Sequence, residues 1–435
     1  MTAHFGSLTH RRPETGCVVD RSIQTGNAMN EIPKIVAEAI RPLGAMEEFI
    51  FLLKQIYSPT VVVGVEIIGE IQPMRLKSAF ERICLQSPHL QARASRKGTR
   101  RPHFFTASPP SVGPFEVLPL LGTHLNTILG EETIKSFSPE DAPVRATLLA
   151  GEQRSILILS ADHMMLDGRG VAYLIEDILH AAKDSAQEGK ASMSLSQDEL
   201  LGLDVASAYA AGSMGGPKIA SDRAALPAPS IENVEIGEQE MVEFRQLARM
   251  GGTTFHALLT AAILETGRLL SKSWQNRAVT FTSVVDNRPL FDQAARLGCY
   301  ISFASGEYPA SQTPFLWEQA TAIRKGITEQ TTHEAVARQM MGLQEALAAD
   351  VRPEDSVNLV GTYDLLVTNY GQVTIRREFD GLRIKKLMPH VISPGVQTVS
   401  VATVGHDLYM SNVSFEPIPQ LLAQSKKRLF DLLAV

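Results

Sequence analysis

The 435-residue sequence has little of what marks several common classes of protein. It contains only three cysteines, Cys17, Cys84 and Cys299, which are too few and too scattered for a disulfide framework or a zinc site. No apolar run approaches the roughly 20 residues that a membrane-spanning helix needs. The net charge is -6, and no cluster of Lys and Arg suggests binding to nucleic acid or to a membrane surface. These absences favour a globular, cytoplasmic protein.

The sequence also lacks the motifs of common cofactor sites. No Gly-rich loop ends in Lys-Ser/Thr, and no G-x-G-x-x-G follows an apolar strand. The segment "AGSMG" at 211–215 is one residue type away from the G-x-S-x-G of serine hydrolases, but no strand precedes it. Nucleotide hydrolysis, nicotinamide redox chemistry and serine hydrolysis therefore have no support, and we expect no bound cofactor and no metal ion.

The composition that remains is that of a globular protein, with 44% hydrophobic and 20% charged residues. The length suits two lobes of roughly 200 residues. Residues 1–42 have no hydrophobic stretch of the secretory kind and are expected to form a partly disordered leader. Residues 43–183 are expected to form an N-terminal lobe and residues 233–435 a C-terminal lobe. The intervening residues 184–232, rich in Ser, Gly, Ala and Pro, are expected to be a crossover between them.

Strands and helices alternate in both halves, which predicts an α/β or α+β protein with two mixed-sheet lobes. The helix after Asp167 has apolar residues at i, i+3, i+4, i+7, i+8 and i+11, the spacing of one buried face. The other expected elements, in chain order, are a strand at 61–68, a helix from Pro73, a hairpin turning at 151–153, a helix from 255, a strand at 279–286, a strand at 363–371, a hairpin through Gly405-His406 and a closing helix at 418–434.

The segment "SADHMMLDG" at 160–168 places a histidine between a buried strand and a helix. Catalytic groups are commonly mounted at such strand ends, and a histidine exchanges protons near neutral pH. A plainer interpretation is a core histidine at 163 with Asp167 as the N-cap of the helix. A metal site at His163 and Asp167 is disfavoured because no third ligand is evident and Met-Met-Leu lies between them. Spacing alone leaves these alternatives open.

The stretch "ADHMMLDG" resembles the H-H-x-x-x-D-G signature of the chloramphenicol-acetyltransferase-like superfamily. That superfamily includes condensation domains of nonribosomal peptide synthetases, polyketide-associated acyltransferases, wax ester synthases and alcohol acyltransferases. The resemblance extends from about 43 to 433 through "SPHLQAR", "DAPVRATLLA", "FTSVVDNRPLF", "LGCYIS" and "LLVTNYGQV". It implies a two-lobed fold in which helices flank a mixed β-sheet in each lobe and a substrate tunnel runs between the lobes.

The resemblance also implies roles for the motif residues. His163 matches the general base of the family, and Gly168 matches a glycine where a side chain would crowd the turn. Asp167 matches a structural aspartate that pairs with an arginine, for which Arg288 is the candidate here. The departure is Asp162, which stands where the family has its first histidine. That carboxylate could raise the pKa of His163 or orient its ring.

A second departure concerns the branch of the family. The D-F-G-W-G motif of the plant and chloramphenicol acetyltransferases is missing, and "EFDGLRIKKL" is only a faint echo of it. The resemblance therefore favours the polyketide-associated and condensation-like branches.

The activity that the resemblance implies is acyl transfer from a pantetheine thioester, either acyl-coenzyme A or an acyl carrier protein. The acceptor would be a hydroxyl or amine of a secondary metabolite or lipid. The oxyanion would be held by Thr368, Asn369 or Tyr370, or by a backbone amide near Gly168. An ordinary turn at the end of a strand is the plainer interpretation of "TNYG". The alternative function is the same fold used without acyl transfer, for recruitment, binding or another reaction such as cyclisation.

Overall fold

The first of two six-stranded sheets is centred on β2 (Thr60–Ile68), the β-branched run of the sequence. β2 lies antiparallel to β7 (Arg154–Asp162), with Thr60 opposite Asp162, and this register brings the end of β7 beside the start of β2. The parallel pair β5–β6 makes the sheet mixed. The strand order is β12 (Glu378–Phe379), β13 (Leu382–His390), β2, β7, β6 (Val144–Ala150) and β5 (Phe115–Pro119).

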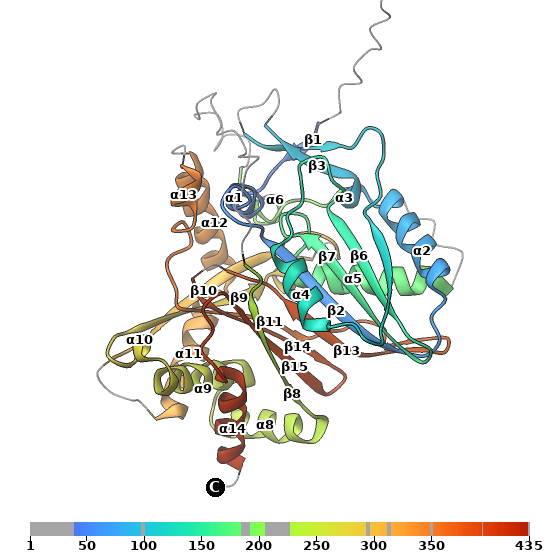
Figure 1. Ribbon diagram of the computed structural model, residues 1–435. Coiled ribbons are helices and arrows are strands. Elements are labelled where there is room, and N and C mark those ends of the chain that lie inside the picture. The colour runs from blue at the N-terminus through green and yellow to red at the C-terminus, as the bar shows by residue number, and fades with distance from the viewer. Residues whose placement is uncertain are drawn as a thin grey trace, which may run out of the picture. The chain divides into compact units, whose positions relative to one another are not determined.

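The second six-stranded sheet is also mixed, because β11 (Leu365–Gln372) runs parallel to both of its neighbours. One face of this sheet packs on four helices, α8 (Glu238–Met250), α9 (Phe255–Leu270), α11 (Leu316–Gln330) and α14 (Leu421–Leu433) (Figure 1). The strand order is β10 (Ile301–Tyr308), β9 (Val279–Asp286), β11, β14 (Gln397–Val404), β15 (Asp407–Ser414) and β8 (Ser230–Ile236).

The other described elements surround these sheets. A three-stranded sheet has the order β1 (Ala39–Pro42), β4 (His103–Thr106), β3 (Ala92–Ser95). The longer helices are α1 (Ala45–Leu53), α2 (Pro73–Gln86), α4 (Leu125–Ile134), α5 (Gly168–Lys183) and α12 (His333–Ala348). The short helices are α3 (Pro88–Gln91), α6 (Gln197–Leu200), α10 (Lys272–Gln275), α13 (Pro353–Ser356) and the 3-10 turn η1 (Arg288–Leu290).

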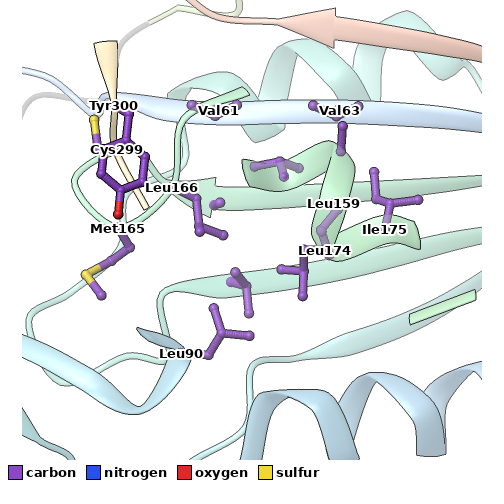
Figure 2. Close-up of a cluster of buried hydrophobic side chains, with 14 of the residues drawn as sticks. Val61, Val63, Leu90, Leu159, Met165, Leu166, Leu174, Ile175, Cys299 and Tyr300 are labelled. Atoms are coloured by element: carbon purple, nitrogen blue, oxygen red, sulfur yellow. The ribbon is translucent and has the colours of Figure 1, made fainter. Parts of the chain in front are cut away.

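The two lobes share a strand and a core. β13 comes from the C-terminal half of the chain but pairs with β2 in the first sheet, where it satisfies the backbone groups of the second edge of β2. The largest hydrophobic core combines side chains of both halves. Figure 2 shows Val61, Leu159 and Leu166 of the first half in one cluster with Cys299 and Tyr300 of the second. The sheets therefore do not follow the sequence boundary drawn at residue 233.

Most of the expected elements are present at the expected places. The strand at 61–68 is β2, and Pro73 occupies the first turn of α2. The hairpins are β6–β7 and β14–β15, the second turning through Gly405 at a φ of 63°. Thr254 caps α9, because its hydroxyl accepts the Ala257 N–H at 3.2 Å. Local periodicity and capping residues were sufficient for these predictions.

The computed structural model describes residues 39–96, 101–183, 192–204, 227–292, 296–310, 315–348, 351–393 and 395–433. All of them belong to one unit, Ala37–Val435. Of the expected leader, only residues 39–42 are described, and they form β1. Of the expected crossover, 184–191 and 205–226 lie outside the described residues. Among the helices that are described, none is long and apolar enough to cross a membrane.

Candidate active site

The loop between β7 and α5 carries the motif histidine. β7 is buried between β2 and β6, so its last residue enters the loop from a rigid strand. The His163 N–H donates to the Pro59 carbonyl just before β2, at 3.1 Å. Two further amides of the loop, those of Met165 and Leu166, donate to the Asp162 carbonyl at 2.9 and 3.2 Å. The backbone on both sides of His163 is therefore held by hydrogen bonds.

His163 lies in a cavity of ≈ 80 Å³ between the two sheets. Its Nδ1 is buried without a hydrogen-bond partner among the described residues. Burial lowers the pKa of His163, while the carboxylates of Asp167 and Asp162 act in the opposite direction. A lowered pKa keeps the imidazole neutral at neutral pH, which is the state in which it accepts a proton.

The two carboxylate oxygens of Asp167 accept hydrogen bonds from different parts of the structure. Oδ1 accepts the Gly170 N–H at 2.8 Å, which makes Asp167 the N-cap of α5. Oδ2 accepts from Arg288 Nη1 at 2.8 Å and from the Tyr300 N–H at 2.9 Å. The Asp167 side chain is only 3% exposed and that of Arg288 10%. The sequence suggested two separate roles for Asp167, the N-cap of the helix and the ion-pair partner of Arg288. The structure shows that one carboxylate makes both contacts and so connects the motif loop to the second lobe.

Arg288, the other partner of this ion pair, is also held by several hydrogen bonds. Arg288 Nη1 donates to Asp286 Oδ1 at 2.8 Å, and Nη2 donates to the Gly298 carbonyl at 3.3 Å. The same carbonyl accepts the Asp167 N–H at 3.0 Å. With two carboxylates against it, the Arg288 guanidinium has a raised pKa despite its burial. The pair is a fixed crosslink between the lobes beside the histidine.

Gly168 is the first residue of α5, and the ring of Tyr370 lies directly against it. A Cβ at position 168 would come within 2.0 Å of Tyr370 Cζ and 2.3 Å of its hydroxyl. Glycine is therefore required here by a close approach from the second lobe, which is a more specific reason than crowding within the turn itself.

The three candidates on β11 do not share a face. Successive residues of a strand point to opposite sides of the sheet. Thr368 and Tyr370 line the His163 cavity. Asn369 points the other way, toward α9, where its Nδ2 lies 3.2 Å from His256 Nδ1 and its Oδ1 accepts the Gly371 N–H at 2.8 Å. The predicted role of Asn369 as a hydrogen-bond donor in the cavity is therefore wrong, and its side chain instead stabilises the end of β11.

Tyr370 contributes a buried polar group to this cavity. Its hydroxyl is buried and has no hydrogen-bond partner within the described part of the chain. Burial raises the pKa of Tyr370, with the negative charge of Asp167 adding to the effect, so the hydroxyl keeps its proton. Burying a hydroxyl without a hydrogen-bond partner costs free energy, and a ligand that accepts a hydrogen bond from it would recover that cost. The Tyr370 hydroxyl is therefore suited to bind a ligand.

Asp162, the residue at the first motif position, does not contact the imidazole with its carboxylate. Its Oδ2 accepts from Lys54 at the end of α1, and its Oδ1 accepts the Met164 N–H at 3.2 Å. The predicted effect of this carboxylate on the pKa of His163 is thus electrostatic, and any effect on the orientation of the ring would act through the loop rather than through a hydrogen bond that the structure shows. The next residues, Met164 and Met165, are 3% and 2% exposed and fill the core; Figure 2 shows Met165 beside Tyr300.

A second, larger cavity of ≈ 290 Å³ adjoins the first. Tyr57, Tyr363 and Ser393 line both cavities, and the Tyr363 hydroxyl lies 3.1 Å from Ser393 Oγ. Sequence reasoning missed Tyr57 and Ser393 because they lie in loops without periodicity, and it placed Tyr363 at the start of the expected strand at 363–371 without assigning it to a cavity. It also missed Lys54, for which the only signal is a single cation at the end of the apolar run "FIFLL". Among the described residues, no group of three His, Cys, Asp or Glu could hold a metal ion.

No protein-family model matches the sequence, and no curated protein is significantly similar to it. Solved structures are similar over nearly the whole chain. Polyketide synthase associated protein 5 from Mycobacterium tuberculosis aligns with a TM-score of 0.64 and 16% identity, covering 91% of this chain and 98% of that one. The first condensation domain of the CDA synthetase aligns with a TM-score of 0.64 and 14% identity, covering 91% and 96%.

The chain has the condensation-domain fold. The TRI3 trichothecene 15-O-acetyltransferase from Fusarium sporotrichioides shares it, with a TM-score of 0.62 and 12% identity over 90% of this chain and 93% of that one. The predicted fold class, two lobes each with a mixed sheet flanked by helices, is confirmed. In this condensation-domain fold, His163 from the first sheet and Tyr370 from the second meet at one cavity between the lobes.

Proposed function

We propose that the protein transfers an acyl group from a pantetheine thioester to a hydroxyl or amine, with His163 as the general base. The imidazole takes the acceptor's proton as the acceptor oxygen or nitrogen attacks the thioester carbonyl carbon. When the tetrahedral intermediate collapses, the carbon–sulfur bond breaks and the proton passes from the imidazolium to the departing thiolate. The products are an ester or amide and a free thiol, and no bound cofactor is needed.

The observation that carries this proposal is the convergence of three groups on one cavity. His163 supplies a base that burial keeps neutral. Tyr370 supplies a buried hydroxyl without a partner, suited to bind an oxyanion. Gly168 lies in the first turn of α5, where backbone N–H groups have no intrahelical acceptor and the helix dipole favours negative charge. Thr368 lines the same cavity as a further polar group.

The residues that line the cavities favour a substrate whose bound part carries no charge. Among the described residues, no charged side chain lines the larger, ≈ 290 Å³ cavity, which is bounded by apolar residues such as Phe49, Leu53 and Val360 and by Tyr57 and Tyr363. A charged group there would lose its hydration without gaining a partner, at a cost of several kcal/mol. We therefore propose an apolar acyl chain or a lipid or secondary-metabolite acceptor. The donor would be acyl-coenzyme A or a loaded carrier protein, and the carrier would then be a protein partner.

The test is release of free thiol from a panel of acyl-coenzyme A donors with added alcohols or amines. The wild type is compared with His163→Ala and with His406→Ala, a control in an exposed turn outside the cavity. We expect acceptor-dependent thiol release that falls roughly 10²- to 10⁴-fold in His163→Ala and stays unchanged in His406→Ala.

Two results would contradict the proposal. Full activity of His163→Ala would remove the histidine from the chemistry. Silence of the folded wild type with every coenzyme A donor and with loaded carrier proteins would favour a binding role or another reaction.

A further inference from the structure

The end of α1 and the motif loop meet in a third cavity, of ≈ 40 Å³, on the side away from His163. Adjacent residues at the end of β7 point to opposite sides, so Asp162 lines this cavity with Lys54 while His163 lines the other. α1 has the same division: Phe49 and Leu53 face the His163 cavity, and Lys54 faces Asp162. One helix and one loop thus form walls of both cavities.

Besides the shared hydrophobic core, an ion pair joins these two walls. Lys54 Nζ donates to Asp162 Oδ2, and the side chains are only 17% and 5% exposed. Lys54 is the C-cap of α1, where its charge also meets the negative end of the helix dipole. The second oxygen of Asp162 accepts the Met164 N–H, so the carboxylate is bound to the loop and to the helix together.

The other charged groups of this cavity are engaged elsewhere. Arg93 donates to Ser111 Oγ and to the carbonyls of neighbouring residues, and Asp141 Oδ2 accepts the Ser138 N–H at 2.8 Å. Within the described chain, Asp162 is the ion-pair partner of Lys54. Arg93 and Asp141 thus have hydrogen-bond partners of their own, although the charge of Asp162 also acts on Arg93.

We propose that Lys54 and Asp162 are a pair of positioning residues that hold the His163 loop at a fixed place relative to α1. This inference rests on the proposed acyl transfer. Breaking the pair removes a side-chain contact between the loop and the helix whose Phe49 and Leu53 line the His163 cavity. The loop then shifts within its remaining hydrogen bonds, and the imidazole is displaced from the reacting atoms. Substrate binding, which depends on the apolar walls, changes less than turnover.

The activity test uses full-length Lys54→Met, Lys54→Arg, Asp162→Asn and the double variant Lys54→Met/Asp162→Asn, with Lys325→Met on the exposed face of α11 as control. Because a misplacement of about 1 Å can cost 10²-fold in rate, we expect kcat of Lys54→Met to fall about 100-fold. KM should change less than about threefold. Lys54→Arg restores the charge and most of kcat, and the double variant is no slower than Lys54→Met alone, since both remove one interaction.

Thermal melting of every variant separates loss of position from loss of fold. A folded Lys54→Met or Asp162→Asn with wild-type kcat overturns the inference. Rate losses that add fully in the double variant also overturn it, because the two residues would then act independently. If Lys54→Met does not fold, the isosteric Asp162→Asn and the conservative Lys54→Arg decide the question by the same criteria.

A second arm does not depend on turnover. In histidine-labelled protein, the ring signals of His163, assigned with His163→Gln, are followed by NMR in the wild type, Lys54→Met and Lys325→Met. A shift of the His163 signals in Lys54→Met alone supports positioning, and unchanged signals overturn it. Absence of thiol release in the wild type would instead contradict the acyl-transfer proposal, so the two failures are distinguishable.

Discussion

Replacing Asp167 by asparagine is expected to destabilise the protein as a whole, because this carboxylate is the buried crosslink between the lobes. Asparagine keeps the shape but removes the charge that faces Arg288, and its NH₂ group meets a donor on one side or the other, either the guanidinium or the Gly170 N–H. Removing one partner of a buried pair typically costs ~3–5 kcal/mol. Arg288 keeps its contact with Asp286, which places the expected loss at about 3 kcal/mol, the lower end of that range.

The assay is thermal and urea unfolding of purified Asp167→Asn. For a unit of roughly 400 residues, an unfolding entropy of about 2.1 cal/mol/K per residue converts 3 kcal/mol into a Tm about 4 °C lower. The matched control is Arg277→Met, which removes a more exposed ion pair, with Asp364, and is expected to cost under about 1 kcal/mol. If Asp167→Asn melted with the wild type, or no lower than the control, the crosslink would not be a major source of stability.

Three further predictions concern the cavity between the lobes. The acidic limb of the pH profile of kcat/KM for thiol release should have its midpoint below ~6.5, because burial lowers the pKa of His163 and the neutral base persists to lower pH; a midpoint at or above neutrality would contradict this. Gly168→Ala should cost about 1–3 kcal/mol, measured by urea unfolding, since its Cβ would come within 2.0 Å of Tyr370 Cζ. Tyr370→Ala in the same background should recover part of that loss, whereas purely additive losses would count against the clash. Tyr370→Phe should leave Tm unchanged or higher, because it removes an unpaired buried hydroxyl, while kcat falls about 10²- to 10³-fold if that hydroxyl binds the oxyanion; wild-type kcat would exclude that role.

Local features of the sequence determined the elements that carry the site. The β-branched run at 61–68 and the helical spacing after Asp167 predicted β2 and α5 correctly, because strand and helix periodicity depend only on neighbours along the chain. The position of His163 at the end of a buried strand followed from the same patterns. Arg288 as the partner of Asp167 came from the family resemblance, since nothing in the spacing of residues 121 apart indicates a contact.

What only the tertiary structure decided is which side chains face one another. Lys54 lies 108 residues from Asp162, and it contacts that carboxylate because α1 packs beside the end of β7. The neighbours Asn369 and Tyr370 were one group in the sequence, yet the pairing of β11 turns them to opposite faces. Periodicity gives the alternation of a strand but not which face meets the cavity, because that choice depends on the sheet and helices packed around it. The sequence by itself therefore determined the motif, its strand and its helix, and long-range packing decided which of the candidate residues reach the histidine.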